Sequence, residues 1–186
     1  MLLAGELGTE SLTQGGGGIL SERTPLTPEL LALAQRAGAI LRARRETIAV
    51  AEGAAGGLIS AALLSVAGAS TFYLGGAIVY TLAASRAFVA GAVPAPPNLR
   101  GASESWALYL ARSAATKLAA TWGIGEGGAA GPTGNRYGDP PGHAWVAVAG
   151  AGEATRHVLT GDDDRGANMA AFACAALELL VEQLEL

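Results

Sequence analysis

Residues 51–57, "AEGAAGG", join a short apolar run to an apolar helical pattern, and chemistry could take place at this elbow. Glu52 is its only reactive side chain, and a carboxylate at a strand end could act as a general base on water. The backbone N–H groups beside Gly56 and Gly57, at the start of a helix, could instead hold a phosphate or a carboxylate. A structural turn is the third interpretation, and the residue types leave all three open.

Two further segments have a composition that suits ligands. The Gly-rich stretch "GGAAGPTGN" (127–135) could cradle a phosphate or a ribose, but it matches neither the dinucleotide fingerprint nor the P-loop. A long surface loop explains it equally well. The acidic run "TGDDDR" (160–165) could ligate a hard cation. We expect instead that Asp163 or Asp164 caps the helix that follows.

Single residues give weaker signals. Tyr80 ends a predicted strand and could be catalytic only beside a base or a nucleophile. His143 borders the long loop and could line a site, whereas His157 lies in an alternating strand and is expected to be exposed. Cys174 lies on an apolar helical face and is expected to be a small core residue. Two histidines and one cysteine cannot form a Cys/His zinc site, so we predict no metal and no cofactor.

The composition limits the classes of partner and the location. With 186 residues, 51% apolar and 15% charged, the chain can form one domain with an Ala-, Val- and Leu-rich core. The net charge of −4 disfavours nucleic acid as a partner. The first residues lack the basic region of a signal peptide, and glycines interrupt the charge-free run 53–85, so we expect buried core rather than a membrane span. A lone cysteine suits a reducing compartment and predicts a cytoplasmic location.

The elements that must position these residues follow from local patterns. Residues 1–24 are polar and Gly-rich and predict a flexible arm, with the folded domain at 25–186. Thr27 and Pro28 are typical of a helix start. Further along, helices and strands alternate, which predicts a layered α/β domain. The expected elements are strand 47–52, helix 58–66, strand 71–82, helix 103–121, a strand end and Gly/Pro loop at 122–142, strands 143–150 and 154–161, and helix 167–186.

The order of these pieces resembles the CinA C-terminal domain family, which includes stand-alone PncC-type nicotinamide mononucleotide amidohydrolases. The likeness runs from about Leu30 to Leu184. It implies a three-layer α/β/α sandwich with a mixed sheet, and a homo-oligomer, a dimer or larger. Six segments in order carry it: "LLALAQRAGAILRARRETIAVAE", "GGLISAALLSVAGAS", "GGAIVY", "GGAAGPTG", "DPPGHAWVAVA" and "LTGDDDR".

The resemblance also implies where a catalytic site would lie and how this chain departs from it. The family elbow reads Ala-Glu-Ser-Cys-Thr-Gly-Gly, so Gly53 occupies the position of the nucleophilic serine. The family lysine that helps to activate this serine corresponds to Ser85, and the adjacent Arg86 cannot act as a base because it stays protonated. Asp139 and Asp163 replace two basic residues, which should weaken the attraction for a phosphate.

The remaining family positions are retained and define the predicted site. Glu52 and Tyr80 are the predicted catalytic residues, and the predicted ligand-binding residues are Gly53, Ala54, Ala55, Gly56, Gly57, Gly131, Pro132, Gly134 and Asp162. The favoured hypothesis is a protein that has lost amidohydrolase activity and keeps a pocket for a nucleotide-like small molecule or an interaction role. One alternative is an active amidohydrolase of altered mechanism using Glu52 and Tyr80, with His143 assisting. The other is a non-catalytic, oligomer-forming structural domain.

Overall fold

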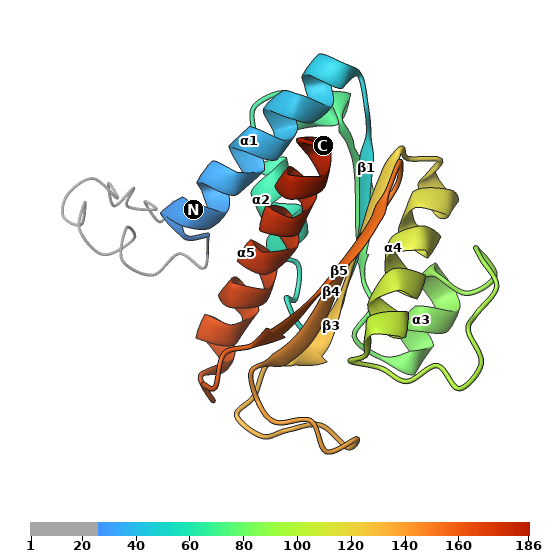
Figure 1. Cartoon of the computed structure of the whole chain (residues 1–186), viewed down its shortest axis with the longest axis vertical. Helices are drawn as coiled ribbons and strands as arrows, with labels where there is room; N and C mark the ends of the chain where they lie inside the picture. Colours follow the sequence, from blue (N-terminus) through green and yellow to red (C-terminus); the bar gives the residue numbers. More distant parts are fainter. Residues whose placement is uncertain (1–25) are drawn as a thin grey trace, which may run out of the picture.

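The structure is a computed structural model that describes residues 26–186, and the predicted arm at residues 1–24 lies outside them. Helices and strands alternate along this part of the chain (Figure 1). The elements are α1 (Pro28–Arg44), β1 (Ile48–Glu52), α2 (Leu58–Leu64), the short 3-10 helix η1 (Ala69–Thr71), β2 (Tyr73–Ile78), α3 (Leu82–Phe88), α4 (Glu104–Leu118), β3 (Trp122–Ala129), β4 (His143–Ala149), β5 (Glu153–Leu159) and α5 (Arg165–Leu184).

The five strands form one mixed sheet between two helical layers. The strand order is β2-β1-β3-β4-β5, with β1 parallel to both β2 and β3, and with β3, β4 and β5 antiparallel in turn. Helices α1, α2 and α5 cover one face, and α3 and α4 lie on the other (Figure 1). The predicted three-layer α/β/α sandwich with a mixed sheet is therefore confirmed.

The larger core lies between the sheet and the layer of α1, α2 and α5. It includes the fully buried side chains of Leu30, Ile124 and Phe172. Helix α5 is the only helix in the described range 26–186 that is long and apolar enough to cross a membrane. Its apolar side supplies much of this core, because Leu177 and Leu180 are fully buried there, so α5 is a buried core helix.

Side chains cap two of the helices as the sequence predicts. The Thr27 hydroxyl accepts a hydrogen bond from the Leu30 N–H at 3.2 Å, which fixes the start of α1. One carboxylate oxygen of Asp164 accepts the Ala167 N–H at 2.8 Å, which fixes the start of α5. The acidic run at 160–165 therefore provides the helix cap that was expected of it.

Two stretches differ from the sequence-based expectation. Residues 122–129 form a full strand, β3, where a strand end and a loop were predicted. The glycines allow close packing: a Cβ at Gly123 or Gly125 would lie 2.0 Å from a backbone oxygen of α4. The predicted strand 71–82 ends at Ile78, and α3 begins at Leu82 after its cap Thr81. Thr81 can end the strand because its hydroxyl accepts the Ala84 N–H and starts a helix.

Candidate functional site

A cavity of about 570 Å³ opens at the carboxyl ends of β1 and β3. This is the sheet edge at which parallel α/β proteins bind their ligands. The elbow after β1, the link from β2 to α3, the start of α4 and the loop after β3 all contribute to its wall. Its lining residues are Gly53, Ala54, Val79, Tyr80, Thr81, Leu82, Leu99, Gly101, Ala102, Trp106, Gly127, Gly128, Asn135, Arg136 and Tyr137.

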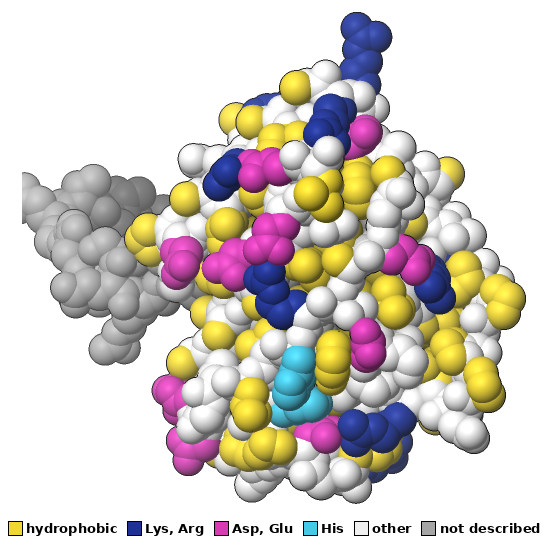
Figure 2. Space-filling model, viewed as in Figure 1, with side chains coloured by type: hydrophobic (Ala, Val, Ile, Leu, Met, Phe, Trp, Pro, Cys, Tyr) yellow, Lys and Arg dark blue, Asp and Glu magenta, His cyan; other side chains and the backbone are white. Residues whose placement is uncertain are grey.

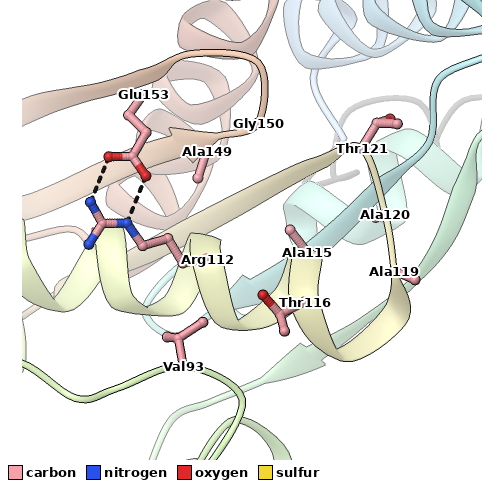
Figure 3. Close-up of a pocket in the computed structure, with 10 residues that line it drawn as sticks. All are labelled: Val93, Arg112, Ala115, Thr116, Ala119, Ala120, Thr121, Ala149, Gly150 and Glu153. Carbon is pink, nitrogen blue, oxygen red and sulfur yellow. Dashed lines mark hydrogen bonds and ion pairs between the residues drawn. The ribbon is translucent and has the colours of Figure 1, made fainter.

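A second hollow, of about 480 Å³, lies at the opposite end of the sheet, where β3 begins and β4 ends (Figure 3). Its charged groups are already paired: the Arg112 guanidinium donates to both carboxylate oxygens of Glu153, at 2.7 and 2.6 Å. Because Arg112 and Glu153 pair with each other, neither charge is free to bind a ligand in this hollow. We therefore take the cavity beside Gly53 as the candidate site.

Glu52, the reactive residue of the elbow, caps α2 rather than facing the cavity. Its side chain is fully buried. One carboxylate oxygen accepts the N–H groups of Gly57 and Ile59 at 2.9 and 3.1 Å, and the other accepts the N–H and hydroxyl of Ser60 at 3.0 and 2.5 Å. Four donors fill the acceptor sites of one carboxylate. To act as a general base, Glu52 would have to give up these bonds, so the geometry lends no support to the predicted catalytic role.

Glu126 is the buried residue that the sequence reasoning missed. One of its oxygens accepts the N–H groups of Gly53 and Ala55, each at 2.9 Å, and the other has no hydrogen-bond partner among the described residues. Burial raises the pKa of Glu126 to about 7, against the opposing effect of these hydrogen bonds, and the nearby Glu52 charge raises it further. A signal existed: Glu126 is the only charged residue between Lys117 and Arg136.

Together the two glutamates use the backbone donors of the elbow. The N–H groups of Gly53 and Ala55 point to Glu126, and those of Gly57, Ile59 and Ser60 point to Glu52. Two internal carboxylates therefore occupy the place where an external phosphate would be held. This arrangement disfavours the anion-binding interpretation of the elbow and explains why β1 ends in a buried acid, Glu52.

Gly53 itself borders the cavity and has room for a side chain. A Cβ at this position would lie 3.5 Å from the backbone oxygens of Glu126 and Val79, which is ordinary contact. Its φ is outside the left-handed region, so the backbone does not require glycine there. A serine would fit at this position.

The partners of a serine nucleophile are not assembled around Gly53. Ser85 is buried on α3 and does not line the cavity. Lys117, the only lysine of the chain, lines a separate hollow with Phe88 and Leu118. It lies about 16 Å along α4 from Trp106, at 1.5 Å per residue. Among the described residues that line the cavity, none is Ser, Cys or Lys.

Tyr80 lines the cavity and is 64% exposed. Arg165 donates to its hydroxyl at 3.3 Å and to the Gly131 carbonyl at 2.8 Å, which brings three of the family segments together. Of the predicted ligand-binding residues, Gly53 and Ala54 also line the cavity. The others do not: Ala55, Gly56, Gly57, Gly131, Pro132, Gly134 and Asp162.

Asp139 does not line the cavity, and its carboxylate is paired rather than free. Its carboxylate accepts two hydrogen bonds from Arg100, at 2.9 and 3.2 Å, and one from the Asn135 amide at 2.8 Å. Burial would raise the pKa of Asp139, but the bonds from Asn135 and Arg100 outweigh it and hold the pKa below its ordinary value. Arg100 therefore compensates the charge of Asp139, at a position where the resemblance implies a basic residue.

Two histidines contact the cavity wall without lining the cavity: His143 bonds to Ala102, and His157 bonds to His143. The Nε2 atom of His143 lies 2.9 Å from the carbonyl oxygen of Ala102, which lines the cavity. Because a carbonyl only accepts, this nitrogen carries a proton, and Nδ1 accepts from Nε2 of His157 at 2.9 Å. His143 is buried and does not itself line the cavity, whereas His157 is exposed, as expected.

Comparisons with known proteins agree with this architecture. The chain is 42% identical over 144 residues to a CinA-like protein of Salinibacter ruber, covering 76% of this chain and 34% of that protein. It is 35% identical over 156 residues to a CinA-like protein of Desulfosudis oleivorans, covering 83% and 38%. The chain thus spans about a third of the length of these curated relatives.

The crystal structure of the competence/damage-inducible protein CihA from Agrobacterium tumefaciens superposes with a TM-score of 0.77 at 28% identity, covering 86% of this chain and 98% of that one. A CinA superfamily protein from Klebsiella pneumoniae gives 0.76 at 26% identity, covering 84% and 98%. The CinA C-terminal domain profile matches residues 30–184, and the chain belongs to this family.

Proposed function

We propose that this CinA domain binds a small molecule in the cavity beside Gly53 without hydrolysing it. The proposal rests on the absence of a side chain at Gly53. This position borders the cavity and has room for a serine, yet it is a glycine. Covalent amide hydrolysis needs a nucleophile and a group that takes its proton. Ser85 occupies the lysine position outside the lining, so both parts of the family's catalytic pair are missing.

The cavity wall suits a planar, nucleotide-like ligand. Trp106, Tyr137 and Tyr80 provide aromatic surface, and Asn135 provides an amide that can donate and accept. Arg136 has no carboxylate partner among the described residues and lies 5.0 Å from the centre of the Tyr137 ring. A ring that stacks on these side chains and an anionic group near Arg136 would use both features.

Nicotinamide mononucleotide is the first probe, because the family resemblance implies it. The full chain should release no ammonia from it above a protein-free blank, while the melting temperature should rise and saturate with ligand concentration. Trp106→Ala should weaken this binding by about 10-fold or more through lost stacking. Arg112→Gln, in the other hollow, is the matched control and should leave binding unchanged.

Two results would overturn this proposal. One is ammonia release at an enzyme-like rate that falls in Tyr80→Phe, because it would point to the altered hydrolytic mechanism. The other is the absence of saturable binding across a panel of nucleotides, which would favour a domain without a ligand.

Gly53→Ser should fold with little change in stability and should stay inactive, because no lysine reaches the cavity.

A further inference from the structure

The part of the cavity beside Gly53 presents hydrogen-bond acceptors. The atoms nearest to a Cβ at Gly53 would be the backbone oxygens of Glu126 and Val79, each at 3.5 Å. The N–H groups of Gly53 and Ala55 are not available to a ligand, because both donate to the Glu126 carboxylate. A ligand atom that enters the space left by the missing side chain therefore meets two carbonyl oxygens and no backbone donor of the elbow.

Both carbonyl oxygens can accept a further hydrogen bond. Val79 is 4% exposed, and nothing in the described part of the chain donates to its carbonyl oxygen. The ladder between β1 and β3 stops at Ala51 and Gly125, and no N–H of the elbow reaches the Glu126 carbonyl. A poorly solvated acceptor without a donor costs free energy. This end of the cavity therefore favours a ligand group that donates hydrogen bonds.

Trp106 places a donor next to these acceptors. A Cβ at Gly127 would lie 2.7 Å from Cδ1 and 2.9 Å from Nε1 of Trp106, so the edge of the indole that carries its N–H lies against Gly127. The Gly127 Cα is in turn 3.9 Å from the Cβ position of Gly53. Trp106 lines the cavity, and within residues 26–186 its indole N–H has no acceptor. The cavity thus offers acceptors and a donor on either side of Gly127.

We propose that this cavity selects a nucleotide whose base carries an amino group next to an unprotonated ring nitrogen, as cytosine and adenine do. The amino group donates to the carbonyl oxygen of Val79 or Glu126, and the ring nitrogen accepts the indole N–H of Trp106. Uracil and hypoxanthine carry an oxygen next to a ring N–H, so both contacts would place like groups against each other. The inference rests on the proposed function, because it names the class of ligand that the same cavity takes.

A single nucleotide fits the charges better than a strand of nucleic acid. Arg136 is the only lysine or arginine among the described residues that line the cavity. Figure 2 shows basic side chains lying beside acidic ones on the face that carries β5, without a continuous basic surface. The net charge of the chain is −4. A nucleic-acid strand needs a basic surface along its phosphates, whereas one phosphate group needs only one cation nearby.

Isothermal titration calorimetry of the full chain with two matched pairs of nucleotides tests the proposal. Cytidine monophosphate should bind at least about 10-fold more tightly than uridine monophosphate, and adenosine monophosphate at least about 10-fold more tightly than inosine monophosphate. The two members of a pair share the same sugar and phosphate and have rings of the same size. Their ratio therefore reports the groups at the edge of the base rather than stacking or charge.

Two variants test the assigned contacts separately. Gly53→Ala puts a methyl group 3.5 Å from both carbonyl oxygens, in the place of the amino group. Trp106→Phe keeps an aromatic ring and removes the N–H. Each variant should reduce the preference within both pairs to about 3-fold or less. Arg112→Gln, in the other hollow, is the control and should keep the wild-type preference, and thermal melts without ligand show that each variant is folded.

The results separate this inference from the proposed function. Equal affinities within both pairs would overturn the inference and leave the proposed function standing, because the cavity would still bind nucleotides. The absence of binding by all four nucleotides would overturn both. A preference that both Gly53→Ala and Trp106→Phe keep in full would also overturn the inference, because the base would then be read elsewhere.

Discussion

Glu126→Gln should remove a loss of stability at high pH that burial of the Glu126 carboxyl causes in the wild type. In the folded protein the pKa of Glu126 is about 7, against an ordinary value of 4.5. A raised pKa means that the folded state keeps its proton while the unfolded state loses it. The contribution to stability is therefore complete below pH 4.5 and is lost as the pH rises through 7.

The magnitude follows from the two pKa values. Between pH 5 and pH 8, the ionisation of Glu126 should cost the wild-type protein about 2 to 3 kcal/mol of unfolding free energy, at 1.36 kcal/mol per pKa unit. Glutamine does not ionise, and its amide oxygen can accept the same two N–H groups from Gly53 and Ala55. Its NH₂ group would take the place of the oxygen that lacks a partner in the described structure. The effect of this NH₂ group on stability does not change with pH, because an amide does not ionise in this range.

Urea denaturation of the wild type and of Glu126→Gln at pH 5, 6, 7 and 8 measures this directly. The difference between the two proteins cancels the titration of all other groups, and it should grow in favour of Gln by about 2 to 3 kcal/mol from pH 5 to pH 8. Glu126→Ala is the control for the hydrogen bonds: it leaves two N–H groups unsatisfied and should be less stable than Glu126→Gln at every pH. A wild type and a Gln variant with parallel pH profiles would refute the reasoning, because Glu126 would then be ionised throughout this range.

Three further substitutions test other contacts of the structure by their effect on stability. Glu52→Gln should destabilise the protein by at least about 1 to 3 kcal/mol in urea denaturation, because its NH₂ group would face backbone donors where a carboxylate now accepts four bonds; unchanged stability would contradict the capping role. Gly125→Ala should lower the unfolding free energy by about 3 kcal/mol or more, because the new Cβ would lie 2.0 Å from the Ala107 oxygen. The control Gly166→Ala, in α5, should be neutral or should raise the unfolding free energy by up to about 1 kcal/mol. Equal effects of the two substitutions would rule out this packing argument. Asp164→Ala should lower the unfolding free energy by about 1 kcal/mol through loss of the α5 cap, and Asp164→Asn should restore most of it; a melting temperature that does not respond would show that the cap contributes nothing.

Local sequence was enough for the elements whose signals lie within a few residues. The caps of α1 and α5 follow from Thr27 and Asp164, and the run of buried residues in β1 follows from its apolar composition. Local signals failed at β3 and α3. Glycines in a strand look like loop residues until α4 is seen to lie against Gly123 and Gly125.

The candidate site depended much more on tertiary contacts. Glu126 is 73 residues from Gly53, and no periodic pattern connects a Gly-rich strand to the elbow whose N–H groups it binds. Asp139 looked like an uncompensated negative charge, but the fold brings Arg100 to it across 39 residues. Glu52 looked like a free base, and only the path of the chain into α2 shows that its four acceptor sites are filled.

The sequence by itself determined the chemistry that is present: glycine at position 53, one lysine in the whole chain and a charge-free run from 53 to 85. These are facts of composition and order, and folding cannot change them. The tertiary structure alone decided which groups meet: two buried glutamates on the elbow, aromatic side chains around the cavity and the uncharged run along one sheet edge. These tertiary contacts depend on long-range packing, because the favourable burial of many apolar side chains fixes the position of a few polar ones.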